Sequence, residues 1–124
     1  MGDVRQYAVD AVSTEIFGRV LLSARNHHFV VDGPEQNGCP GEEVTPVEVF
    51  LAAVAACGVE LVQVIAKGEG VPLTRVAVAI SGTMDRGKPV RTDVSLLNSV
   101  RMRFQLAGVS QEEGERLIGA FKGR

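Results

Sequence analysis

The two cysteines are the side chains of this chain that could do covalent chemistry. Cys57 lies in the apolar stretch AAVAACGVEL, residues 52–61, and Cys39 lies in a stretch rich in glycine and proline, directly before Pro40. A thiol reacts as its thiolate, which a nearby cation or a helix N-terminus favours. A lone cysteine in an alanine-rich helix is by default a buried, inert side chain. The chemistry of Cys57 therefore depends on what the rest of the chain places around it.

The composition predicts a single globular domain over residues 1–124. A hydrophobic fraction of 45% argues against disorder, and a net charge of −2 with both signs mixed along the chain predicts no nucleic-acid-binding face. The longest apolar run, residues 49–59, is too short to span a membrane, and the N-terminus has no signal-peptide core. Two cysteines do not make a disulfide framework, so we expect a reducing cytoplasm and a free thiol.

Strands and a loop are predicted before residue 45. Residues 4–13 alternate in polarity as a half-buried strand does, and residues 17–24 and 28–32 are two further predicted strands. The turn between the second and third should place Asn26 in the left-handed conformation. Residues 33–44 contain three glycines and two prolines, which predicts an irregular loop long enough to have a function.

A long helix is predicted after this loop. Thr45-Pro46-Val47-Glu48 combines a capping residue, a proline suited to the first helical position and a glutamate that completes a capping box. The helix should run to about Lys67, where the glycines at 68 and 70 end it.

The second half of the chain predicts two strands and a short helix. Residues 75–82 form one strand, residues 83–91 a polar connection, and residues 93–108 a strand with apolar side chains at even positions. Ser110 opens a helix whose capping box Glu113 completes. Because strands gather before and after the long helix, the sequence predicts an α+β fold with antiparallel sheet around a central buried helix.

The central helix poses a packing problem. Residues 49–59 are apolar on every side, so every side must be buried, and one small sheet covers only one face. We therefore expect a homodimer in which the two central helices are in contact. The alternative is that the short C-terminal helix covers the second face.

The order and spacing of these motifs are similar to those of the OsmC/Ohr family, the osmotically inducible and organic-hydroperoxide-resistance proteins. In that family a glycine-rich loop leads into a Thr/Ser-Pro-x-Glu helix start, and a helical Ala-Ala-Cys follows eleven residues after the proline, the spacing of Pro46 and Cys57. The downstream order also agrees: Gly-x-Pro, a strand, a long strand ending in glycine, and an acidic helix. The resemblance covers roughly residues 28–122.

The resemblance implies a thiol-dependent peroxidase that reduces organic hydroperoxides. We expect no metal or other cofactor. In the family, the helical cysteine is the peroxidatic thiolate and becomes a sulfenic acid. A second cysteine, in a Cys-Pro motif at the start of a C-terminal helix, resolves it, and a dithiol reductant restores it. An arginine and often a glutamate beside the helix-start proline orient the thiolate. The family fold is an interwoven homodimer with the active sites at the interface.

Four residues are candidates for these roles, and Cys57 matches the peroxidatic position. Val47 stands where the Ohr-type glutamate would be; Glu48 comes one place later, as in other branches, and equally fits a helix cap. Arg19 is a better candidate than Arg25 for the activating arginine, because it lies within a strand rather than at a turn. The alternative for Arg19 is a solvated strand residue.

The resolving cysteine departs from the family pattern. The family's second Cys-Pro should follow the helix that ends near Arg124. Either this protein lacks the resolving cysteine, with the Cys-Pro helix and the last strand, or the sequence is a shortened form of a longer chain. Cys39-Pro40 could take over, since six residues reach ~20 Å and Cys57 lies ~18 Å along the helix. A disulfide to the partner chain and an exposed loop thiol are the alternatives for Cys39. The adjacent histidines at 27 and 28 point to opposite faces of a strand, so no metal site is expected.

Two functions remain open from the sequence. The first is a cytoplasmic hydroperoxide reductase with Cys57 as nucleophile and an organic peroxide as substrate, as the apolar helix suggests. The second is a non-catalytic homodimer of the same fold that binds a small apolar ligand or has a structural role. The replacement of the Ohr-type glutamate by Val47 and the missing Cys-Pro favour the second.

Overall fold

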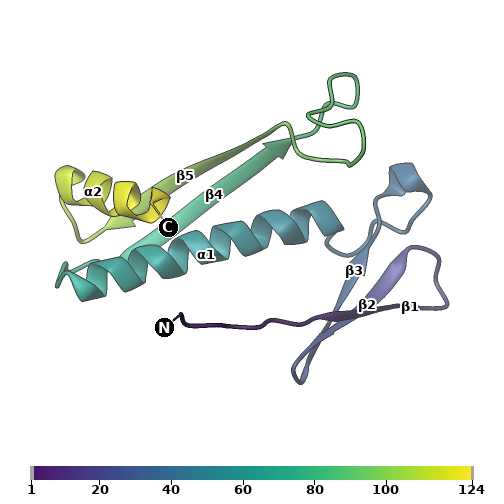
Figure 1. Cartoon of the computed structure of the whole chain (residues 1–124), viewed down its shortest axis with the longest axis horizontal. Coiled ribbons are helices and arrows are strands. Elements are labelled where there is room, and N and C mark those ends of the chain that lie inside the picture. Colours follow the sequence, from purple (N-terminus) through teal and green to yellow (C-terminus); the bar gives the residue numbers. More distant parts are fainter. Residues whose placement is uncertain (1, 124) are drawn as a thin grey trace. The chain divides into compact units, whose positions relative to one another are not determined.

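The computed structural model describes residues 2–123 and confirms the α+β class (Figure 1). The chain divides into two compact units, Met1–Phe50 and Leu51–Arg124. The elements in chain order are β1 (Asp10–Ser13), β2 (Arg19–Ala24), β3 (His27–Asp32), the 3-10 turn η1 (Glu35–Asn37), α1 (Pro46–Gly68), β4 (Arg75–Thr83), β5 (Ser99–Ala107) and α2 (Gln111–Lys122).

The first unit is built on an antiparallel sheet in the order β1-β2-β3. The strand predicted at residues 4–13 is shorter than expected, because its pairing starts at Asp10 opposite Ser23, near the end of β2. The β2–β3 turn was predicted at the right place, but Arg25, with φ of 56°, takes the left-handed conformation instead of Asn26. The register of this turn places Arg19 directly opposite the last residue of β3.

The loop at residues 33–44 is more ordered than predicted, since it contains η1 and is tied back to the sheet. The Gly33 N–H donates to the carbonyl of Gly18 at 2.8 Å, and the Gly41 N–H donates to the carbonyl of Gly33 at 3.1 Å. The N–H of Asp32 donates to the carbonyl of Val44 at 3.0 Å, so both ends of the loop meet.

At the start of α1, the Glu48 carboxylate accepts from the backbone of Thr45, which is one of the two hydrogen bonds of the predicted capping box. The backbone N–H and the hydroxyl of Thr45 both donate to Glu48 Oε1, at 2.9 and 2.8 Å. These two hydrogen bonds lower the pKa of the Glu48 carboxyl, the backbone one contributing most. The helix ends at Gly68, and Gly70 follows with φ of 69°, so the predicted end is confirmed.

The apolar stretch of α1 is longer than the run of residues 49–59 suggested. By length and composition alone, the 23-residue helix is long and apolar enough to cross a membrane. The core helix of a globular protein meets the same criterion, and α1 supplies buried residues to the core of the second unit.

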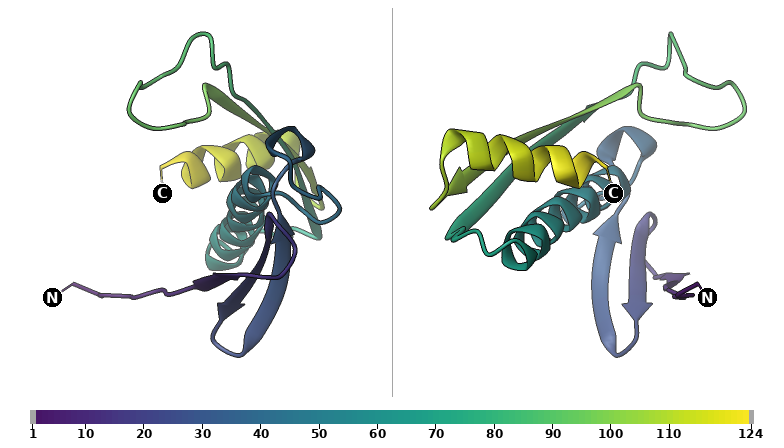
Figure 2. Two further views of the ribbon diagram at one scale, coloured as in Figure 1. Left: turned by 90° about the vertical axis from the view of Figure 1, so that its right-hand side faces the viewer. Right: turned by 60° about the vertical axis from the view of Figure 1, so that its left-hand side comes forward.

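In the second unit, α2 and the C-terminal part of α1 cover one face of the antiparallel β4–β5 ribbon (Figure 2). The buried core consists of Val62, Ile65 and Ala66 from α1 and Leu117 from α2. Two of the apolar even-numbered side chains of β5, Phe104 and Leu106, pack against this core as predicted, whereas Val100 is exposed. The predicted capping box of α2 is confirmed in both directions.

The packing of α1 differs along its length. Leu117 of α2 packs against residues 62–66, so the short C-terminal helix covers this end as the alternative supposed. Further toward the N-terminus, Ala52, Ala53 and Ala56 are exposed. This face of α1 is not covered by the described residues of its own chain.

The strand predicted at residues 93–108 begins only at Ser99. Residues 93–98 form a loop although their polarity alternates, because β4 ends at Thr83 and offers them no partner. Asn98 closes the loop: its side-chain oxygen accepts from the Asp85 N–H at 2.7 Å, and its amide donates to the Lys88 carbonyl at 2.6 Å.

Candidate functional site

Cys57 lies in the middle of α1 and is exposed. The next residue, Gly58, is buried, and a Cβ there would lie 3.0 Å from Met102 Cε and 3.3 Å from Phe104 Cζ. The helix therefore turns Gly58 toward β5 and leaves the thiol at the surface. Burial, the usual reason for an inert cysteine, does not apply to Cys57 in this structure.

The surroundings of Cys57 on α1 are largely apolar. Residues three, four and seven apart share a helical face, which places Ala53, Leu61 and Val64 beside the thiol, together with the exposed carboxylate of Glu60. Val64 is 51% exposed and Ala53 is also exposed. Among the described residues, no hydrogen bond to the Cys57 sulfur is found. Any group that stabilises a thiolate must come from outside this face.

Arg19 is held by two carboxylates. Its Nε donates to Asp32 Oδ1 at 2.8 Å and its Nη2 to Asp32 Oδ2 at 2.9 Å, a two-pronged ion pair. Nη2 also donates to Glu42 Oε1 at 2.9 Å. The Arg19 side chain is only 23% exposed, so it is an ion-paired residue and not a freely solvated one. Both acidic partners raise the pKa of its guanidinium, which stays charged.

Asp32 is fully buried and accepts more hydrogen bonds than any other carboxylate described here. In addition to Arg19, its Oδ2 accepts the backbone N–H groups of Glu42 and Glu43, at 3.0 and 2.9 Å. The guanidinium of Arg19, followed by these backbone donors, holds the pKa of the Asp32 carboxyl far below its ordinary value although burial opposes the shift. Asp32 is therefore an ionised group inside the protein, held by the Arg19 side chain and by the backbone N–H groups of Glu42 and Glu43.

Reasoning from sequence singled out Arg19 but missed Asp32. The signal was present in the predicted hairpin: a two-residue turn that pairs Ala24 with His27 also pairs Arg19 with Asp32. Opposite charges directly across two antiparallel strands predict an ion pair.

Cys39 is half-buried and not the exposed loop thiol that was one alternative. Its side chain lies against Gly18 and Gly33, where a Cβ on either glycine would overlap the Cys39 sulfur. The sulfur lies 3.9 Å from the carbonyl oxygen of Asn37. Cys39 thus packs on the residues next to Arg19 and Asp32, within the first unit.

The remaining candidates are distributed as follows. Glu48 belongs to the first unit with Arg19 and Cys39, and its carboxylate is engaged by Thr45. Cys57 belongs to the second unit. Within residues 2–123 no group of three or more His, Cys, Asp or Glu side chains could hold a metal ion.

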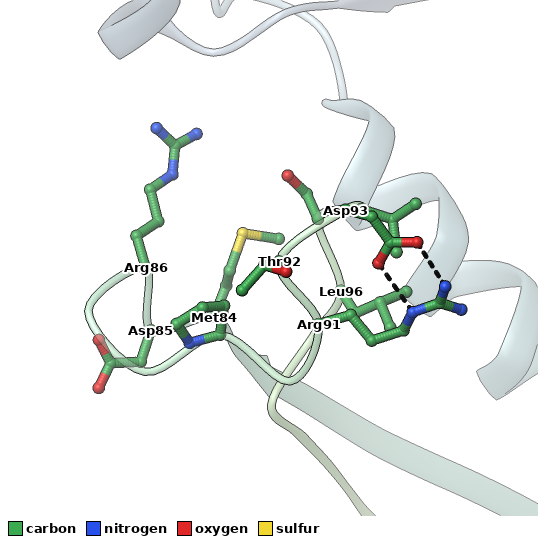
Figure 3. A pocket seen from close by; sticks show the side chains of 10 residues that line it. Met84, Asp85, Arg86, Arg91, Thr92, Asp93 and Leu96 are labelled. Carbon is green, nitrogen blue, oxygen red and sulfur yellow. Dashed lines mark hydrogen bonds and ion pairs between the residues drawn. The ribbon is translucent and has the colours of Figure 1, made fainter.

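A pocket of about 460 Å³ was not predicted and lies in the loop between β4 and β5. It contains no cysteine; its lining runs from Met84 to Leu96 and mixes acidic, basic and apolar side chains. Arg91 forms an ion pair with Asp93, whereas the side chain of Arg86 points away from that pair (Figure 3). The pocket lining therefore offers no thiol, and its charged side chains are of both signs.

Comparisons with solved structures show which fold this is. An OsmC-like protein from Mycoplasma pneumoniae aligns with a TM-score of 0.80 and 16% identity, over 97% of this chain and 82% of that one. Organic hydroperoxide resistance proteins from Elizabethkingia anophelis and Legionella pneumophila give TM-scores of 0.76 and 0.74, each at 18% identity. These two alignments include 96% and 95% of this chain, respectively, and 82% of each of the other two chains.

Sequence comparison gives the family. A search of curated proteins found no match. The family model described as OsmC-like protein matches residues 39–122, about two thirds of the sequence, including both cysteines. The chain belongs to the OsmC-like protein family.

Proposed function

We propose that the protein is a thiol-dependent peroxidase that reduces organic hydroperoxides, with Cys57 as the reacting residue. The observation that carries the proposal is an exposed thiol on an apolar helix. Its spacing of eleven residues from Pro46 resembles that of the peroxidatic cysteine in the family. The apolar side chains beside Cys57 favour a hydroperoxide with an organic group over hydrogen peroxide, because burying that group removes apolar surface from water.

The reaction starts when the Cys57 thiolate attacks the hydroperoxide oxygen farther from the organic group. A sulfur–oxygen bond forms, the oxygen–oxygen bond breaks, and the organic oxygen takes up a proton and leaves as an alcohol. Cys57 is thereby oxidised to a sulfenic acid. A second thiol, from Cys39 or from the dithiol reductant, then displaces water from that sulfur and forms a disulfide. The dithiol reductant breaks this disulfide by thiol exchange, which returns the Cys57 thiol and leaves the reductant oxidised.

Arg19 is the proposed activating cation, and Glu48 a proposed auxiliary carboxylate. A guanidinium favours the thiolate over the thiol by charge and by hydrogen bonding. We also propose that the chain works as a homodimer, because the exposed apolar part of α1 needs a cover. Cys39 is the candidate resolving thiol within this chain.

A second function has specific support. Val47 occupies the place of the Ohr-type glutamate, and the Glu48 carboxylate is already used by Thr45 at the helix start. A site without a free carboxylate would suit a non-catalytic homodimer that binds a small apolar ligand.

Consumption of tert-butyl hydroperoxide by the reduced protein separates the two functions. A peroxidase should oxidise Cys57 far faster than an ordinary exposed thiol reacts, and Cys57→Ser should abolish the consumption. A rate equal to that of free cysteine, measured at the same pH, would rule out the peroxidase. Sedimentation at micromolar concentration tests the homodimer separately, and a monomeric mass would exclude it.

A further inference from the structure

The guanidinium of Arg19 is held on one side only. Arginine has five N–H donors, and three of them, on Nε and Nη2, are engaged by Asp32 and Glu42. Within residues 2–123, no hydrogen-bond partner is found for the two donors on Nη1. The ion pair therefore fixes the direction of the planar group and leaves one edge of it available.

Asp32 is suited to fix that direction because it is itself immobile. It lies at the end of β3, is 0% exposed, and uses Oδ1 for Arg19 alone. Its Oδ2 accepts the N–H groups of Glu42 and Glu43 as well as Nη2 of Arg19. These backbone donors keep the carboxylate from rotating, so one buried group sets the orientation of Arg19 and closes the 33–44 loop.

Glu42 contacts the same guanidinium in a different way. Its side chain is 74% exposed and makes a single contact, through Oε1, with Arg19. A solvated carboxylate can leave such a contact at little cost, whereas loss of a buried partner leaves a charge uncompensated. The chain thus places a fixed and a removable carboxylate on one arginine.

We propose that Asp32 is the positioning residue of Arg19, orienting its free Nη1 edge for the anionic sulfur of the reacting cysteine. This inference rests on the proposed function, because it takes Arg19 as the activating cation. Asp32 does not touch the reacting atoms and acts only through Arg19. Glu42 competes with the thiolate for the same positive charge.

The test uses Cys39→Ser as the background, so that Cys57 is the remaining thiol. Into it are introduced Asp32→Asn, Glu42→Gln, Arg19→Ala and the pair Arg19→Ala with Asp32→Asn. The readouts are the pH profile of Cys57 alkylation by iodoacetamide and the second-order rate with tert-butyl hydroperoxide. Asp93→Asn is the matched control, since it also removes the aspartate of an arginine ion pair, in the exposed β4–β5 loop.

We expect Asp32→Asn to slow alkylation at pH 7 about tenfold or more and to move the midpoint of its pH profile upward. Glu42→Gln should react as fast as the background or faster, although it too removes one negative charge from Arg19. In the Arg19→Ala background, Asp32→Asn should cause no further loss, because residues that act through one another are not additive. Asp93→Asn should leave the profile unchanged.

Three results would overturn the proposal: an unchanged alkylation profile in Asp32→Asn, an equal loss with and without Arg19, or the same loss in Glu42→Gln. If Asp32→Asn does not fold, Arg19→Lys replaces it, since lysine keeps the charge but lacks the fork that Asp32 binds. Arg19→Lys should then reproduce the upward shift, and a background-like profile would refute the role. Slow hydroperoxide consumption by the unmutated protein would refute the proposed peroxidase function separately. The alkylation profiles would still show whether Asp32 positions Arg19.

Discussion

Replacing Gly58 by alanine measures how closely α1 packs on β5, directly beside the proposed reacting thiol. Gly58 is buried in the interior of the helix, and its new methyl group would lie 3.0 Å from Met102 Cε and 3.3 Å from Phe104 Cζ. Both distances are shorter than ordinary contacts. The methionine end can move aside, but the Phe104 ring also packs against Phe121, with ring centroids 5.5 Å apart.

Two opposing effects set the size of the change. Alanine favours the helix over glycine by about 1 kcal/mol, whereas overpacking a core costs about 1–3 kcal/mol. Because one neighbour is flexible and the other is held, we take the middle of that range, about 2 kcal/mol. The net expectation for Gly58→Ala is a loss of about 1 kcal/mol in the free energy of unfolding.

Gly119→Ala is the matched control. Gly119 lies inside α2, and a Cβ there meets nothing within 4 Å, so only the helix preference acts and stability should rise by about 1 kcal/mol. Urea unfolding of both variants at one fixed protein concentration should therefore separate them by about 2 kcal/mol. If Gly58→Ala were as stabilising as Gly119→Ala, the close packing of α1 on β5 would be refuted.

Three further outcomes follow from the buried carboxylate, the core and the second helix cap. Because the pKa of Asp32 is lowered in the folded state, its stabilisation is complete above about pH 4, the ordinary value for aspartate, and is lost as the pH falls below it. Acid unfolding of Asp32→Asn should therefore be less steep below pH 4 than that of the unmutated protein, and equal steepness would contradict the ion pair with Arg19. Leu117→Ala should cost about 3 kcal/mol in urea unfolding, since the side chain is fully buried among α1 and β5, and a loss under 1 kcal/mol would contradict that burial. Ser110→Ala should cost about 1 kcal/mol by the same measurement, because the hydroxyl accepts the Glu113 N–H at 3.1 Å; an unchanged midpoint would show that the cap is not formed.

The helix boundaries could be predicted from sequence because capping depends on residues three positions apart. Thr45 with Glu48, and Ser110 with Glu113, carry their own start signals, and the structure confirms both positions. The prediction of the left-handed residue in the β2–β3 turn was wrong. Among residues with a side chain, Asn tolerates that conformation best, but the strand register put the position at Arg25.

The remaining differences come from pairing between distant segments. Val94 and Leu96 continue the alternation of β5, yet they are 47% and 43% exposed because no strand within residues 2–123 pairs with them. Alternation indicates that a segment can be a strand, and only a partner makes it one. Asp32 was missed likewise, since its importance arises from four donors on Arg19, Glu42 and Glu43, none adjacent to it in sequence.

The apolar length of α1 also has a consequence for biosynthesis. Residues 62–66 are buried by Phe104 and Leu117, which the ribosome adds only about 40 and 50 residues later. At synthesis rates of about 5–20 residues per second, the finished helix waits for several seconds without its cover. During that time, a 23-residue segment apolar enough to cross a membrane is exposed on the nascent chain. The same helix that presents Cys57 is thus an apolar segment that the nascent chain leaves uncovered until β5 and α2 have been added.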